Sequence, residues 1–449
     1  MRIVQLVGAL LLLQVSPAMA QTLAPPAPPP IVRILPVDPV RTAPVDATAL
    51  PAPILETTDQ ALTDDAREYA RHFAVSIEEA RRRLILQEAS VAATDAIADR
   101  YRDRLAGIAI DHSPTYRISV YLTGTEPVAE RRVTVGVSSV PIIFRTGAPV
   151  TRDQVIWAMT NHQAAIRAAL RTPPGMGLDP RTGELVLTIG NRDARDGTEA
   201  IRQRIEAIAG VPVQVRAVDH VDVNLAVEGG ARVEGVNPGD GKRYLCTTGF
   251  AVTDGTRSAI ATAAHCVDEL SYRDRAGALV PLPFVAQWGW GYRDVQINLS
   301  PEPLAPTFFA DTAKTRVRPV TGQRSRAGTR AGDFVCHRGE RTGYSCAVVQ
   351  FTDFAPAGDL CGGACLPTWV AVSGPTCKGG DSGAPVFTGT TALGILKGAS
   401  YRPDGSCAFY FYMSADYLPD GWTILRSPLP APVTSSSRSN DRSGSSALP

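Results

Sequence analysis

Residues 377–385, Cys-Lys-Gly-Gly-Asp-Ser-Gly-Ala-Pro, place a single serine among glycines that allow backbone N–H groups to approach a reacting atom closely. A serine hydroxyl is a weak nucleophile by itself. Ser382 therefore needs a base that takes its proton, a group that orients this base, and N–H donors for an oxyanion. The stretch predicts nucleophilic catalysis, and the rest of the sequence can be searched for the partners that this chemistry requires.

The sequence around this stretch is typical of an all-β domain. Residues 226–426 are rich in glycine, threonine and short β-like runs, and turn signals recur every few residues. Antiparallel strands in a sandwich or barrel fit this pattern. The expected strands are 245–253, 259–264, 295–299, 347–351, 369–372, 384–387 and 392–396.

Two of the six histidines, His265 and His337, lie in this β-rich half and are the candidates for the base. His265 follows a predicted strand that ends in small residues, and the adjacent Cys266 can fix its backbone, which suits an imidazole held in one orientation. His337 is the reserve candidate. Asp294 opens an apolar strand and is the best of several carboxylates to accept a hydrogen bond from the far nitrogen of the base.

All eight cysteines lie at or after residue 246. An even number of cysteines in one half of an exported chain predicts a disulfide-stapled domain, although the sequence alone leaves the pairing open. Zinc binding is the alternative. Only Cys361 and Cys365 have ligand-like spacing, and no second close pair or histidine accompanies them, so we expect neither a metal nor another cofactor. The cysteines are Cys246, Cys266, Cys336, Cys346, Cys361, Cys365, Cys377 and Cys407.

The first 20 residues have the pattern of a secretory signal peptide. Arg2 supplies the positive charge, residues 3–13 are largely apolar, and Ala-Met-Ala at 18–20 forms a small-residue cleavage signal. A single-span anchor is the alternative, but the apolar run is shorter than the ~20 residues of a spanning helix. We therefore expect a secreted or periplasmic protein that is not held in a membrane.

The segment between the signal peptide and the β-rich half divides into two parts. Residues 21–58 are proline-rich and predict an extended linker. Residues 59–225 alternate helical and β-like patterns and predict an α+β domain, with Ser76 and Glu79 in the form of a capping box. A Ser/Pro-rich tail at 427–449 predicts disorder. The helices are expected at 59–106, 151–171 and 198–208, and the strands at 116–122, 132–137, 184–189 and 211–218.

Composition excludes some partners. The net charge is +1, 44% of the residues are apolar, and no long block of like charge occurs. These values are ordinary for a globular protein and give no reason to expect nucleic-acid binding.

The order of the motifs carries a resemblance. Thr-Ala-Ala-His-Cys at 262–266, then an aspartate, then Gly-Asp-Ser-Gly at 380–383 resemble the chymotrypsin-type serine proteases. Residues 335–346, Val-Cys-His-Arg-Gly-Glu-Arg-Thr-Gly-Tyr-Ser-Cys, resemble the bacterial alpha-lytic protease and streptogrisin group. The resemblance implies a catalytic domain of two six-stranded antiparallel β-barrels, preceded by an α+β pro-domain. The likeness is weaker in the pro-domain, where the turn at 178–182 contributes to it.

The resemblance also implies roles for individual residues. Ser382 becomes the nucleophile, His265 the base and then the acid, and Asp294 the group that orients His265. The backbone N–H groups of Gly380 and Ser382 would hold the oxyanion. The implied disulfides are Cys246–Cys266, Cys336–Cys346 and Cys377–Cys407, and the remaining Cys361 and Cys365 are expected to pair.

Asp381 needs a partner if it is buried beside the nucleophile. In the bacterial relatives a basic residue follows the first cysteine of the neighbouring hairpin. His337 occupies that place here and Arg338 comes next. We therefore predict that His337 or Arg338 pairs with Asp381 and shapes the oxyanion hole.

Two positions depart from the family pattern. Ala384 replaces the usual second glycine after the serine, and Lys397 stands where a serine normally supports the aspartate. The Lys397 ammonium could pair with Asp294, point to solvent, or enter the specificity pocket. Lys397, Gly398 and Ala399 are the pocket candidates, and the absence of an acidic residue at the pocket floor disfavours a preference for lysine or arginine.

These observations predict a secreted, monomeric serine endopeptidase that forms an acyl-enzyme. Its partners would be polypeptide substrates and its own pro-domain. We expect the chain to process itself between Asp222 and Glu234, near Val227 or Gly230. One alternative is a catalytically impaired, protease-like binding protein. Another is an exported binding protein in which the N-terminal domain is the functional part, and there the two halves would stay in one chain.

Overall fold

The structure is a computed structural model that describes residues 52–195, 197–218, 230–274, 277–374 and 376–427, together with the backbone of 221–224. The predicted signal peptide, most of the proline-rich linker and nearly all of the Ser/Pro-rich tail lie outside these residues. Within the described part, no helix is both long and apolar enough to cross a membrane.

The described chain begins with one short strand and three helices. Thr57 caps the first helix and forms a reciprocal capping box with Gln60. Ser76 caps the second helix by accepting from the Glu79 backbone N–H, whereas the Glu79 carboxylate pairs with neighbouring arginines. The elements are β1 (Ile54–Leu55), α1 (Thr58–Phe73), α2 (Ile77–Ala89) and α3 (Val91–Arg100).

Two α+β layers follow. A four-stranded sheet has the order β2-β3-β5-β4, in which β3 and β5 are parallel. Helices α4 and α7 then pack their apolar faces on β6, β7 and β8. The predicted helix at 151–171 is two shorter helices. The bounds are β2 (Leu105–Asp111), β3 (Arg117–Thr123), β4 (Arg131–Val135), β5 (Ser138–Ala148), α4 (Arg152–Asn161), α5 (Gln163–Ala168), β6 (Gly175–Asp179), β7 (Glu184–Gly190), α6 (Asn191–Ala194), α7 (Thr198–Ala209) and β8 (Val213–Val218).

The first half of the β-rich region consists of two antiparallel sheets, with the orders β11-β10-β14-β15 and β16-β17-β13-β12-β27. The predicted strand at 245–253 is two strands, β11 and β12, with Gly249 and Phe250 in the interruption between them. Gly249 has no room for a side chain, because a Cβ would lie 2.7 Å from Ile395 and 2.9 Å from two carbonyl oxygens. The bounds are β10 (Arg232–Val236), β11 (Arg243–Thr247), β12 (Ala251–Thr253), β13 (Ser258–Thr262), β14 (Leu270–Arg273), β15 (Leu279–Leu282), β16 (Phe284–Trp288), β17 (Val295–Leu299) and β27 (Thr423–Ile424).

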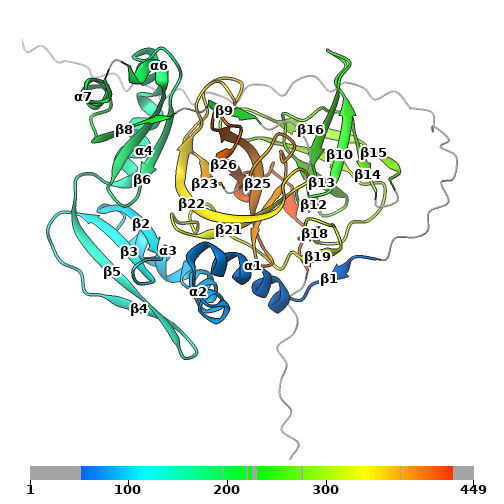
Figure 1. Ribbon diagram of the computed structural model, residues 1–449, viewed down its shortest axis with the longest axis horizontal. Helices are drawn as coiled ribbons and strands as arrows, with labels where there is room; N and C mark the ends of the chain where they lie inside the picture. Colours follow the sequence, from blue (N-terminus) through cyan, green and yellow to red (C-terminus); the bar gives the residue numbers. More distant parts are fainter. Residues whose placement is uncertain are drawn as a thin grey trace, which may run out of the picture. The chain divides into compact units, whose positions relative to one another are not determined.

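The second half is a closed six-stranded barrel with the order β21-β24-β25-β26-β23-β22, which β21 and β22 close by pairing with each other (Figure 1). Alternating buried residues such as Val370, Val372, Tyr410 and Tyr412 fill its interior. The all-β fold class expected for this region is confirmed. The bounds are β18 (Thr307–Phe309), β19 (Arg316–Pro319), β20 (Gly322–Gln323), β21 (Phe334–Gly339), β22 (Gly343–Ala355), β23 (Trp369–Ser373), β24 (Pro385–Thr388), β25 (Thr391–Tyr401), β26 (Cys407–Ser414) and the 3-10 turn η1 (Ala415–Tyr417).

Strands of the N-terminal region extend this barrel sheet. Strand β6 pairs antiparallel with the end of β22, so that β6, β7 and β8 continue the sheet beyond the barrel. A further strand, β9 (Val221–Asn224), pairs antiparallel with β25. At the other end, β1 pairs with β19, so ordered structure begins before the predicted boundary at residue 59.

Buried polar contacts join the N-terminal helices to the barrel. Arg318 on β19 is fully buried and donates to Glu56 at 2.8 Å and to Asp65 at 2.7 Å. The Tyr344 hydroxyl donates to the same Asp65 carboxylate at 2.6 Å. The carboxylates that neutralise Arg318 therefore both come from the N-terminal region.

Replacing Arg318 with methionine should lower the unfolding free energy by about 3–5 kcal/mol, because Asp65 would remain buried without its cation and Glu56 would keep only Arg316. Urea unfolding of the variant, in a Ser382→Ala background that keeps the chain intact, measures this loss. Arg316→Met is the matched control. Its side chain is 40% exposed although it also pairs with Glu56 and Asp64, so its loss should be about 1 kcal/mol or less. Equal losses for the two variants would contradict the assignment.

Candidate active site

The structure brings Ser382, His265 and Asp294 together in one hydrogen-bonded chain. The Ser382 Oγ lies 2.7 Å from His265 Nε2, and His265 Nδ1 lies 2.7 Å from Asp294 Oδ2. The backbone N–H of His265 also donates to Asp294 Oδ1 at 3.2 Å. Two contacts to the same carboxylate fix the imidazole plane and direct Nε2 at the serine.

Strand pairing explains why residues so distant in sequence meet. Strands β13 and β17 are antiparallel and Thr262 pairs with Gln296. The end of β13 and the start of β17 therefore lie side by side. His265 follows β13 and Asp294 precedes β17, so both residues lie at these neighbouring strand ends. Ser382 reaches these strand ends from the turn before β24, and Gly383 leaves no space for a Cβ beside Thr247 and Thr262.

The Asp294 carboxylate is ionised although it is 1% exposed. Burial alone would raise its pKa, but the facing His265 and Lys397 outweigh this effect and hold the pKa at about 2. The His265 side chain is 18% exposed, whereas Ser382 is fully buried.

The segment around Ser382 presents two adjacent N–H donors. Among the described residues, neither the Gly380 N–H nor the Ser382 N–H has an acceptor, whereas the Asp381 N–H between them donates to the Lys378 carbonyl. The Gly380 peptide is held by the Thr247 hydroxyl, which donates to its carbonyl at 3.1 Å. Two free donors next to a nucleophile are what an oxyanion requires.

The predicted direct pairing of Asp381 with His337 or Arg338 is wrong. The Asp381 carboxylate accepts from the Thr342 hydroxyl at 2.8 Å and from the backbone N–H groups of Lys378, Arg341 and Thr342 at 3.0–3.3 Å. His337 reaches it only through Thr342, whose Oγ1 lies 3.3 Å from Nε2.

Asp381 does not pair with these side chains because the turn between β21 and β22 directs its backbone N–H donors at the carboxylate, while His337 is buried. Burial lowers the pKa of His337, which keeps the ring neutral and makes it a poor ion-pair partner. Its ring packs edge-on against Tyr410, so it is not the reserve base either. Arg338 donates instead to Glu340 and to the carbonyls of Asp311 and Thr312.

Gly339 makes this arrangement possible, because a Cβ at residue 339 would overlap the Asp381 carboxylate. Gly339→Ala should displace Asp381 and the donors on either side of it, and lower kcat/KM for a peptide substrate by about 100-fold, as the loss of one oxyanion donor does. Gly322→Ala is the control, because its Cβ would meet Thr391 at an ordinary 3.5 Å. Full activity of Gly339→Ala would contradict this role.

Lys397 points toward Asp294 rather than into solvent or a substrate pocket. Its Nζ lies 3.3 Å from Asp294 Oδ2 and 5.1 Å from the centre of the Trp369 ring. The side chain is therefore not a pocket wall, which corrects that part of the prediction. The other two pocket candidates, Gly398 and Ala399, pair with Asn224 and Val223 of β9.

The four predicted disulfides are present. Cys361 and Cys365 are bonded to each other, so their sulfurs are not available as zinc ligands. The pairs are Cys246–Cys266, Cys336–Cys346, Cys361–Cys365 and Cys377–Cys407.

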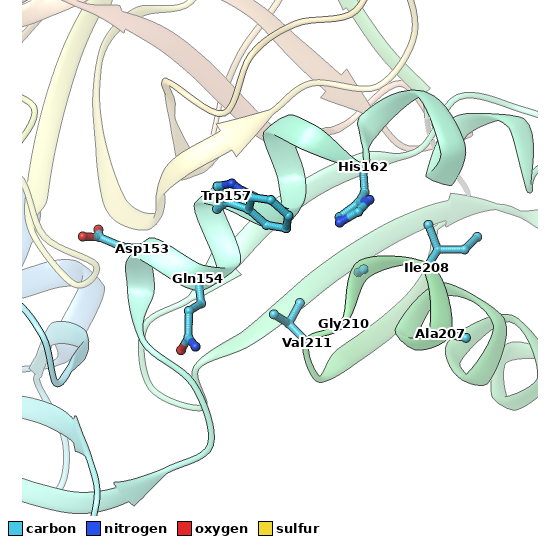
Figure 2. A pocket seen from close by; sticks show the side chains of 9 residues that line it. Asp153, Gln154, Trp157, His162, Ala207, Ile208, Gly210 and Val211 are labelled. Atoms are coloured by element: carbon cyan, nitrogen blue, oxygen red, sulfur yellow. The ribbon is translucent and has the colours of Figure 1, made fainter. Parts of the chain in front are cut away.

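A separate hollow lies between α4 and α7 (Figure 2). Trp157, whose side chain is exposed, packs edge-on against His162 there with ring centres 5.1 Å apart. Figure 2 shows Asp153 at the opposite end of the hollow from His162, so the two do not form an acid–base pair.

Comparison with known proteins places this geometry in context. No protein-family model matches the chain. Over 178 residues the chain is 26% identical to Streptogrisin-C of Streptomyces griseus, and the match covers 37% of this chain and 35% of the relative. The C-terminal half has a chymotrypsin-like all-β fold, and the match to Streptogrisin-C is a likeness over part of each chain. The chain thus spans about a third of the length of the curated relative that it matches.

Solved structures similar to this chymotrypsin-like domain have low identity to it. Thermobifida fusca Protease A is 21% identical, with 45% of this chain and 99% of that chain covered and a TM-score of 0.34. Nocardiopsis Protease is 20% identical over 42% and 91%, with a TM-score of 0.32. Alpha-lytic protease homolog N4 is 21% identical over 42% and 93%, with a TM-score of 0.33.

Sequence reasoning missed three contributors to the site. Thr342 and Gly339 act together on Asp381, and both lay in the hairpin sequence that carried the family resemblance. Trp369 covers Lys397, and its position in a predicted strand gave no sign of this contact.

Proposed function

We propose that the protein is a serine endopeptidase that hydrolyses peptide bonds through Ser382, His265 and Asp294. The observation that supports this most strongly is the continuous hydrogen-bonded chain from the serine hydroxyl through both imidazole nitrogens to a buried, ionised carboxylate. The similarity to Streptogrisin-C agrees with it.

In the proposed reaction, Ser382 Oγ attacks the carbonyl carbon of a peptide bond while its proton moves to His265 Nε2. The negative charge on the former carbonyl oxygen is held by the N–H groups of Gly380 and Ser382. His265 then gives the proton to the leaving amine as the C–N bond breaks. Water, deprotonated by His265, attacks the ester carbon. As the ester C–O bond breaks, His265 returns the proton to Ser382 Oγ and the new carboxyl end is released. Asp294 stays ionised throughout and stabilises the imidazolium.

We also propose that the protein is exported and made as a zymogen that cleaves itself. The disulfide-stapled domain fits export. The pairing of β9 with β25 supports self-cleavage, because β25 runs beside Ser382. Leu396 of β25 exchanges backbone hydrogen bonds with Gly383 and Ala384, and Asn224 of β9 pairs with Gly398, two residues further along.

The direction of β9 supports a cleavage site that follows it in the sequence. Because β9 is antiparallel to β25, it advances toward the level of Ser382 as it runs from Val221 to Asn224. We propose the Leu225–Ala226 bond, which follows β9 in the sequence and lies outside the described residues. The site expected near Val227 lies outside the described residues. Gly230 is disfavoured because it packs tightly on Thr248 and Pro385.

The activity can be tested with Val-Asp-Val-Asn-Leu-p-nitroanilide, which copies residues 221–225. The purified, processed protein should release nitroaniline, with kcat in the ordinary range of about 1–1000 per second. A folded protein that binds this peptide without hydrolysing it, and that leaves casein intact, would favour the alternative of a protease-like binding protein.

A further inference from the structure

We propose that Lys397 is a positioning residue of this site, whose buried ammonium shares the Asp294 carboxylate with His265 and thereby keeps the imidazole neutral to lower pH than the other two residues alone would allow. This inference rests on the proposed function. It concerns one of the two positions at which the chain departs from the family that it resembles.

One carboxylate oxygen serves both cationic partners. Asp294 Oδ2 lies 2.7 Å from His265 Nδ1 and 3.3 Å from Lys397 Nζ. Lys397 and Asp294 are each 1% exposed, so water screens neither charge. The ammonium is further held over the Trp369 ring, a favourable place for a desolvated cation.

The backbone of β25 explains why Lys397 faces inward. The pairing of β25 with β26 shifts register between Leu396 and Gly398, which marks a bulge at Lys397. A bulge redirects a side chain relative to the regular alternation of a strand. Lys397 is therefore aimed at the triad by the strand itself.

Among the described residues, two cationic or protonatable side chains contact the Asp294 carboxylate. From the segment after β13 it faces His265, and from β25 it faces Lys397. The neighbour on β26 is the uncharged Met413, whose sulfur accepts from the Asp294 N–H, and Trp369 of β23 is uncharged as well. The adjacent Arg293 pairs with Asp420 at the surface.

Lys397 changes which form of the imidazole, neutral or protonated, leaves the buried group without net charge. With Lys397 present, the buried group is neutral when His265 is neutral and carries one positive charge when His265 is protonated. Without Lys397, the group is neutral only when His265 is protonated. Since an uncompensated charge is costly to bury, Lys397 favours the neutral imidazole, the form that can accept the Ser382 proton.

The repulsion between the Lys397 ammonium and a protonated His265 also opposes one step of the reaction. An imidazolium forms transiently while Ser382 attacks, and Lys397 opposes it. The cation therefore extends activity toward acid and lowers the maximal rate at alkaline pH. A purely structural lysine would produce no such crossover between the two pH ranges.

The test compares the processed wild type with Lys397→Met, which keeps the length of the side chain, and Lys397→Ser, which restores the usual family residue. In both variants the acid limb of the kcat/KM profile for the nitroanilide substrate should move to higher pH by about one unit or more. Activity at alkaline pH should be equal or higher. Lys397→Arg should keep the wild-type profile. Unchanged midpoints in Lys397→Met and Lys397→Ser would overturn the proposal.

A second readout does not depend on hydrolysis. In the Ser382→Ala full chain with isotope-labelled histidines, NMR follows protonation of the His265 ring, and Lys397→Met should move its titration to higher pH. A shift in this variant, together with a wild-type protein that hydrolyses no peptide, would keep the inference and reject the protease function. If both neutral variants fail to fold while Lys397→Arg folds, the cation is structural and the inference is overturned.

Discussion

Replacing Ser382 with alanine should leave the chain in one piece and abolish peptide hydrolysis. In serine proteases of other folds, loss of the nucleophile lowers kcat by about a million-fold, and we borrow that magnitude here. The physical reason is that the variant lacks the Ser382 hydroxyl, which lies 2.7 Å from His265 Nε2 and would accept the acyl group. Mass spectrometry of the purified variant should show only the form in which the Leu225–Ala226 bond is intact.

Ser258→Ala is the matched control, because Ser258 lies on β13 and leads into the same site without contacting it. It should process normally to a product that begins at Ala226. A mature-size product from Ser382→Ala would show that another protease cuts the chain. That result would remove self-processing and leave the hydrolytic function to be judged on the nitroanilide substrate.

Replacing Asp294 with asparagine should lower kcat by about ten thousand-fold, a magnitude taken from the same substitution in the chymotrypsin-type triad. An amide favours the wrong imidazole tautomer and cannot stabilise an imidazolium. In this chain the substitution has a second effect, because Lys397 would lose its carboxylate and remain buried with an unpaired charge. The unfolding free energy should therefore also fall, by about 3–5 kcal/mol.

The double variant Asp294→Asn/Lys397→Met separates the two effects. It should recover most of the stability and none of the activity, since the unpaired cation is gone and the carboxylate is still missing. Thermal unfolding and kcat on the same samples give both numbers. An Asp294→Asn variant that is inactive but fully stable would show that Lys397 does not depend on Asp294.

The pKa of Asp294 also decides which group limits activity in acid. Its pKa is about 2 in the folded chain, below the ordinary value of 3.8, so the stability that it contributes is present above about pH 4 and is lost as the pH falls through 2. Asp294 therefore stays ionised at any pH at which activity is measured.

The sequence was most informative where one residue type carries one chemical role. A serine among glycines, a histidine after a strand of small residues and an aspartate opening an apolar strand could be selected one by one, and the structure brings all three together. The cysteine pairs followed from the family resemblance. Such features depend on local sequence and on chain order.

Features that depend on long-range register could not be predicted. The direction of Lys397 depends on a bulge that only the pairing of β25 with β26 defines. The partners of Asp381 lie in the turn at residues 339–343, about 40 residues earlier in the sequence. Because the conformation of this turn could not be predicted, His337 and Arg338 were expected in their place. The ordered strand β1 lay in a proline-rich linker, and its partner β19 is more than 250 residues away.

The most direct test of the central claim is the reaction of the processed protein with a biotinylated fluorophosphonate, which modifies activated serines. We expect one adduct per chain, on the peptide that contains Ser382, and none in Ser382→Ala. Prior incubation with the nitroanilide substrate should slow the reaction. A processed protein with the circular dichroism of a folded β-barrel that takes up no phosphonate would contradict the account.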